Sequence, residues 1–171
     1  MSPDVPETEW VLAYVYVQRR EHTHALQHLE SAVRRSPSFA DAYALIGTVN
    51  TYVGNPAQAV GLVRTAMRLN PEGSILYFLT LGQAYLFLGD FEQARVNLEH
   101  ALSRNPAYLE SHVYMAVLHV LRDDKAAAVW EAEEIRTLKP GLSSRRWLAT
   151  HPMTDPAQKT KLVQALGQLG F

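Results

Sequence analysis

The sequence predicts an all-α fold, a right-handed α-solenoid of about four helix pairs followed by one or two C-terminal helices. Two observations support this prediction: a regular spacing of prolines, and a pattern of small residues and turn signals repeated before each of them. The prolines stand 34, 35 and 34 residues apart, at Pro37, Pro71, Pro106 and Pro140. A period of this length is typical of stacked supersecondary units, each of which buries its apolar face against its neighbours.

Small residues recur at fixed distances before each proline. Twelve residues before the prolines stand Ala25, Ala59, Ala94 and Ala128. Twenty-four residues before them stand Ala13, Gly47, Gly82 and Ala116. The two helices of a hairpin approach closely only where one of them offers small side chains and bulky neighbours fill the flanks. The pattern therefore predicts paired helices.

Turn residues separate the two helices of each predicted pair. They are Gly54-Asn55-Pro56, Gly89-Asp90, Arg20-Glu21-His22 and Asp123-Asp124-Lys125. Glycine and aspartate allow the backbone geometry that ends a helix, and each repeated proline ends the second helix of its pair. We expect a solenoid domain over residues 1–140, with units at about 6–39, 40–74, 75–108 and 109–141.

This pattern resembles the tetratricopeptide repeat, a helix-turn-helix of about 34 residues. The third unit matches best, with Phe78, Leu81, Gly82, Tyr85, Ala94, Leu98, Ala101 and Pro106 in the signature places. The fourth is weakest, because His112 and His119 replace the aromatic residues and Ile135 replaces an alanine. The resemblance covers about residues 6–140. It implies a protein-interaction module whose first helices line a concave groove.

Composition and charge narrow the function classes. With 171 residues, 47% of them hydrophobic, the chain is long enough for one continuous core. The formal net charge is −1 and no basic block occurs, which argues against nucleic acid and anionic membranes as main ligands. The absence of cysteine excludes disulfides, thiol catalysis and zinc-thiolate sites. No signal peptide or membrane span is recognisable, so we expect a cytoplasmic protein.

The last 30 residues, 142–171, follow no 34-residue pattern and are called the tail below. A short helix is expected over Leu142–Ala149, and a second after Thr154-Asp155-Pro156, where an N-cap precedes a proline of the first turn. The second helix can cap the last unit or lie in the groove. The tail also resembles the C-terminal tetratricopeptide region of bacterial multidomain proteins that carry nucleotide-cyclase or winged-helix domains. That resemblance suggests a fragment of a larger regulator.

The groove residues implied by the resemblance are mixed in character at one end and apolar at the other. They are Trp10, Tyr14, Tyr52, Leu79, Gln83, Leu86, Phe87, Val113, Val117 and Val120. An exposed apolar surface of this size is unusual for a monomer, so we expect the tail, a second copy of the chain or a partner helix to cover it. Selectivity is expected from Glu7, Asp41, Gln83 and Glu110.

No catalytic, cofactor or metal site is predicted. His24 and His28 are spaced for a shared metal ion, but no further ligand is recognisable, and we expect both to be solvated. The carboxylates of Glu131, Glu133 and Glu134 are also expected on a solvated face. The sequence therefore predicts a non-catalytic module that binds a helical or extended protein segment. The alternatives are a regulatory region of a larger bacterial signalling enzyme or transcription regulator, and a homo-oligomeric scaffold.

Overall fold

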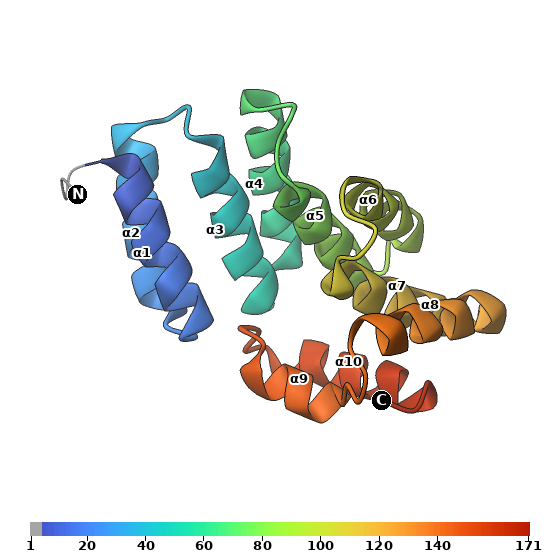
Figure 1. The fold of residues 1–171 in the computed structure, drawn as a ribbon. Coiled ribbons are helices and arrows are strands. Elements are labelled where there is room, and N and C mark those ends of the chain that lie inside the picture. The colour runs from blue at the N-terminus through green and yellow to red at the C-terminus, as the bar shows by residue number, and fades with distance from the viewer. Residues whose placement is uncertain (1–4) are drawn as a thin grey trace.

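The computed structural model describes residues 5–171, and over this range it contains ten helices and no strand. Eight helices form four consecutive pairs: α1 (Pro6–Gln18) with α2 (His22–Arg35), α3 (Ala40–Tyr52) with α4 (Pro56–Leu69), α5 (Ile75–Leu88) with α6 (Phe91–Arg104), and α7 (Leu109–Leu121) with α8 (Lys125–Leu138). The tail forms α9 (Ser144–Thr150) and α10 (Pro156–Gln168). The pairs stack in chain order, which confirms the predicted all-α solenoid (Figure 1).

Each pair turns at one residue with a left-handed backbone. The φ angles are 61° at Arg20, 91° at Gly54, 80° at Gly89 and 56° at Asp123. Only two of these four residues are glycines, although the left-handed region is costly for other residue types. The repeated prolines each stand two residues beyond the last residue of α2, α4, α6 and α8, as the sequence predicts.

The small residues lie where the helices of a pair cross. A methyl group added at Gly47 in α3 would lie 2.6 Å from Val63 Cγ2 of α4. One added at Gly82 in α5 would lie 2.6 Å from Leu98 Cγ of α6. Both distances are shorter than carbon atoms tolerate, so glycine is needed for these helices to approach so closely. The small residues in the sequence pattern therefore mark the positions where the two helices of a pair cross.

The tail folds back beneath the solenoid (Figure 1). Helix α10 packs against α7, the first helix of the fourth pair. Residues 111–118 of α7 are all buried, because α5, α6 and α8 cover part of the helix and α10 covers more of it. On α8 the side chains of Val129 and Trp130 remain 54% and 57% exposed. The tail thus covers the inner helix of the last pair and leaves part of its outer helix bare.

None of the helices in residues 5–171 is long and apolar enough to cross a membrane.

Candidate functional site

An extended stretch of the tail, residues 151–155, crosses the groove and is called the crossing segment. The amides of Thr154 and Asp155 donate to the carbonyl oxygen of Tyr52, at 2.9 Å and 3.0 Å. This carbonyl belongs to the last residue of α3, where helical carbonyls lack partners within the helix. His22 Nε2 lies 2.9 Å from the Pro152 carbonyl oxygen. The first two helix pairs therefore hold the crossing segment through its main chain.

Arg20 holds the end of α9 in the same way. Its guanidinium donates to the carbonyl oxygens of Leu148, at 3.2 Å, of His151, at 3.0 Å and 3.1 Å, and of Ala149. These carbonyls lie at the C-terminal end of α9, which carries the partial negative charge of the helix. A cation is the favourable group there. Arg20 thus joins the first turn of the solenoid to residues about 130 positions later in the chain.

His151 links the crossing segment to the fourth pair. Its Nε2 lies 2.8 Å from Glu110 Oε1, and its Nδ1 accepts a hydrogen bond from the Met153 amide at 3.1 Å. Because Nδ1 accepts, the ring proton is on Nε2 and the imidazole is neutral. The ring packs between Tyr52 and Trp147, with centroid distances of 5.0 Å and 4.7 Å.

Glu110 therefore keeps its negative charge without a cationic partner. Its Oε1 accepts from the neutral imidazole of His151, and the Tyr108 hydroxyl lies 3.4 Å from Oε2. In residues 5–171 no lysine or arginine forms an ion pair with this carboxylate. Such a half-buried charge is expected to attract a cation.

The predicted groove residues separate into a covered and an open set. Five of them are buried at the apolar end beneath the tail: Leu79, Gln83, Leu86, Val113 and Val117. Tyr52 is also buried, and Trp10, Phe87 and Val120 are half-buried. Tyr14 is 46% exposed. In α10, Leu162, Ala165 and Leu166 join the same apolar cluster as Val113 and Val117, so the tail occupies the apolar end.

Several polar atoms of α5, α7 and α10 are buried without a hydrogen-bond partner among the described residues. Both amide atoms of Gln83 are buried without a hydrogen bond among the described residues. The same is true of Tyr114 Oη in α7 and Gln158 Oε1 in α10. Each such atom costs about 1–3 kcal/mol of desolvation. The tail is therefore held by its apolar residues, by main-chain contacts and by the hydrogen bond between His151 and Glu110.

A pocket of about 190 Å³ remains in the groove, lined by residues from α1, α3, α5 and the start of α7 and by Pro152 of the crossing segment. Three tyrosines line it, Tyr14 of α1, Tyr52 of α3 and Tyr108 before α7, and we call it the tyrosine pocket. Its other lining residues include Gln18, Thr48, Leu79, Glu110 and Pro152. Burial first, and then the charge of Glu110, raise the pKa of Tyr108 to about 12. The same two causes raise the pKa of Tyr52 well above its ordinary value.

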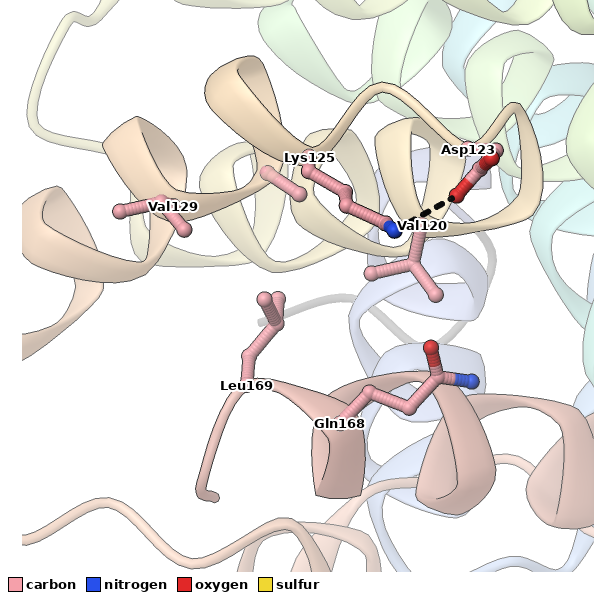
Figure 2. Close-up of a pocket in the computed structure, with 7 residues that line it drawn as sticks. Val120, Asp123, Lys125, Val129, Gln168 and Leu169 are labelled. Carbon is pink, nitrogen blue, oxygen red and sulfur yellow. Dashed lines mark ion pairs between the residues drawn. The ribbon is translucent and has the colours of Figure 1, made fainter.

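A second pocket, of about 260 Å³, lies where the end of α10 meets the turn between α7 and α8. Figure 2 shows Val120 and Val129 on one side and Gln168 and Leu169 on the other. Its only ion pair among the described residues joins Lys125 Nζ to Asp123 Oδ1 at 3.9 Å, and both side chains are exposed. The two charges offset each other, so this pocket offers a ligand little besides apolar contact.

The histidines considered as metal ligands have other partners. His28 Nδ1 lies 2.6 Å from Glu9 Oε2, and its ring stacks on Tyr16 at 5.2 Å. No group of three or more potential metal ligands occurs in the described part of the chain. The prediction that Glu131 is solvated is wrong. Its carboxylate is buried 2.7 Å from His112 Nδ1, and this hydrogen bond raises the pKa of His112.

Sequence reasoning missed several residues of the site. The sequence indicates Arg20 and His22 only as turn residues, and it places His151 only between the two predicted helices of the tail. Tyr108 is not among the residues that the sequence predicts for the groove. The only usable signal is Arg20, a long cation in a turn position where two other units have glycine.

Comparisons with known proteins fit this geometry. Residues 76–108 match the tetratricopeptide repeat family. The chain folds as a tetratricopeptide repeat solenoid. PilW, a widely conserved type IV pilus biogenesis factor, superposes with a TM-score of 0.74 at 18% identity, over 99% of this chain and 74% of PilW. YrrB, a tetratricopeptide repeat protein with an unusual peptide-binding site, gives a TM-score of 0.65 at 17% identity, over 98% of this chain and 86% of YrrB.

A curated relative is anaphase-promoting complex subunit 3 of Schizosaccharomyces pombe, 30% identical over 105 residues. The match covers 61% of this chain and 16% of that subunit, so the chain spans a small part of its relative. The likeness to PilW and YrrB shows the fold alone. None of the three is described as a cyclase or winged-helix regulator, and the second resemblance of the tail remains a prediction.

Proposed function

We propose that this tetratricopeptide repeat solenoid binds an extended segment of another protein in the open end of its groove, beside its own docked tail. One observation carries the proposal: the tail covers the apolar end and leaves the tyrosine pocket available. Tyr14 and Gln18 at this pocket are exposed, while Thr48 and Leu79 form buried parts of its wall. Concave sites with a few polar groups among apolar ones are the usual form of a binding site.

An extended ligand fits this surface better than a helical one. The crossing segment is itself extended, and it binds the neighbouring surface through main-chain groups. A peptide bound beside it meets apolar side chains below and tyrosine hydroxyls around it. By contrast, the long apolar surface that an amphipathic helix needs is already covered by α10.

Peptide selection on the intact chain tests this proposal. A random displayed library is selected against the wild type, and the affinity of the enriched peptides is measured by fluorescence polarisation. Tyr14→Ala removes a pocket wall and is expected to weaken binding at least about tenfold. Val15→Ala is the matched control, because Val15 lies next to Tyr14 on α1, does not line the pocket and is 47% exposed. Equal affinity for both variants would refute binding in this pocket.

A homo-oligomeric scaffold is the second candidate, and the outer face of α1 favours it. Val11 and Leu12 are exposed there, together with Val15. One repeat later the corresponding Leu45 and Val49 of α3 are buried, and α3 packs against α1 and α2. A stacking surface is thus present on α1 without a neighbour in this structure. Light scattering tests it: Leu12→Glu should return any particle above the 19.2 kDa chain mass to that mass.

A further inference from the structure

We propose that the tyrosine pocket is a binding site for a primary ammonium group, the head of a lysine side chain presented by a partner protein. The inference deepens the proposed function and depends on it for the partner. It starts from the unpaired charge of Glu110. This carboxylate faces a pocket whose other polar groups are hydroxyls and one amide.

The charge inside the pocket is set by the tautomer of His151. Because the Met153 amide donates to Nδ1, the imidazole cannot accept a proton there without losing this hydrogen bond. His151 therefore donates one neutral hydrogen bond to Glu110 Oε1 and does not cancel its charge. Glu110 Oε2 has only the Tyr108 hydroxyl nearby, at 3.4 Å, and is free to accept from a cation.

Carboxylates recur at the start of the first helices, but only Glu110 lines the tyrosine pocket. Asp41 occupies in α3 the place that Glu110 has in α7, and Glu7 occupies it in α1, so carboxylates mark three of the four first helices at this level. Tyr77 donates to Asp41 at 2.6 Å without neutralising it. Arg20, which contacts the carbonyl oxygen of His151, is occupied by the carbonyls at the end of α9.

Lysine fits the pocket better than arginine. One oxygen of Glu110 is already engaged by His151, so the paired contact that a guanidinium makes with both oxygens is not available. An ammonium group has three donors and no fixed plane, and it can meet Oε2 together with tyrosine hydroxyls. The methylene stem would lie along Leu79 and the tyrosine rings, as lysine stems do on apolar surfaces.

The test uses small probes and the whole chain. Nα-acetyl-lysine methylamide is titrated into the ¹⁵N-labelled protein and amide shifts are followed. We expect saturable shifts at Tyr14, Gln18 and Tyr108 with a Kd of about 1 mM, as befits a probe of this size. The norleucine analogue has the same stem and no charge, and it should bind at least about tenfold more weakly. Equal binding of both probes would overturn the assignment.

Glu110→Gln is the decisive variant. A glutamine carbonyl still accepts from His151, so the tail stays docked, and unchanged amide shifts of α10 verify this. Lysine-probe affinity should fall at least about tenfold, while Glu7→Gln, at the exposed start of α1, should leave it within about twofold. Unaltered lysine binding in Glu110→Gln contradicts the site.

Peptide selection separates this inference from the proposed function. Enriched peptides that bind in the groove without a basic residue would overturn the lysine site and leave the peptide-binding function standing. If the lysine probe binds while no peptide is enriched, the ammonium site stands and the proposed function fails. Peptides whose affinity depends both on one lysine and on Glu110 support the two together.

Discussion

The contacts between helices within a pair and the contacts between the tail and the groove differ in kind. Gly47 and Gly82 let the paired helices meet through buried apolar atoms. The tail is held by apolar residues of α10, by hydrogen bonds that Arg20 donates to main-chain carbonyls and by hydrogen bonds that main-chain amides donate to the Tyr52 carbonyl oxygen. The first kind of contact is part of the fold. The second joins a separate segment to the solenoid, and we expect this segment to open before the repeats do.

Leu98→Ala should have the largest effect on the unfolding free energy, because it disrupts the close contact between the two helices of a pair. Leu98 is fully buried against Gly82, and a cavity at such a site costs about 2–5 kcal/mol of unfolding free energy. Urea unfolding followed by circular dichroism measures it. Leu88→Ala is the matched control at a side chain that is 46% exposed, and it should cost less than about 1 kcal/mol. Similar losses in both variants would contradict the comparison.

Gly47→Ala tests the close contact between α3 and α4 by adding a single methyl group. The new carbon would meet Val63 Cγ2 at 2.6 Å and the Ala59 carbonyl oxygen at 3.3 Å, so we expect a loss of about 1–3 kcal/mol. Gly61→Ala in α4 is the opposite control, since nothing lies within 4 Å of the added carbon. It should stabilise the helix by about 0.4–1 kcal/mol. Thermal unfolding of both variants must therefore shift in opposite directions.

Arg20→Gln addresses the weaker class of contact. Removing the guanidinium leaves the carbonyls of Leu148 and His151 without their cation, which should cost about 1–2 kcal/mol of docking free energy. Hydrogen exchange should speed up in α10 and stay slow in α4 and α6. Arg19→Gln is the control, because Arg19 is exposed and pairs only with Glu21 among the described residues. Equal acceleration throughout the solenoid would show that tail and repeats unfold together.

Acidification should give the smallest effect, through His22. Burial lowers the pKa of His22 below 6.5. The positive charge of Arg20 lowers this pKa further, while the hydrogen bond to Pro152 partly offsets the shift. The undocked state then takes up a proton first, so docking is strongest above pH 6.5 and weakens as the pH falls towards the lowered pKa. Exchange in α10, corrected for intrinsic rates, should rise by less than about tenfold. His22→Gln should flatten this dependence.

His112, in the fourth helix pair, should contribute a pH dependence of stability that is opposite to that of His22. Its hydrogen bond to Glu131 raises its pKa above 6.5, so it stabilises the fourth pair at low pH and loses that contribution as the pH rises through the raised value. Acid should therefore loosen the tail at His22 while leaving the contact between α7 and α8 intact. Loss of the fourth pair before the tail would reverse this order.

The repeating part of the fold was predictable because its causes are local. Turn residues such as Gly54 and Gly89 act on their own backbone, and Pro71 or Pro106 stops the helix immediately before it. Asp155 likewise caps α10 by accepting from the Gln158 amide, as the sequence indicates. Because these local signals recur at a regular spacing, they predict successive helix pairs of similar length, which stack into a solenoid.

The site was less predictable because its causes are distant in the chain. The apolar character of Leu79, Val113 and Val117 indicates that something must cover them, but it does not exclude a second copy or a partner in place of the tail. Arg20 meets residues about 130 positions later, and no property of either segment encodes that distance. The sequence does not indicate that the Glu131 carboxylate is buried, because its partner His112 lies on another helix.

The solenoid holds the crossing segment mainly through main-chain groups of that segment, so the same contacts can form between two molecules. Arg20, His22 and Tyr52 contact carbonyls and amides that any chain of the same course presents. We expect that a tail released from one molecule can dock on another without any change of sequence, because domain swapping exchanges identical segments between copies. Concentrated protein should contain tail-swapped dimers whose two grooves are each filled as in the monomer.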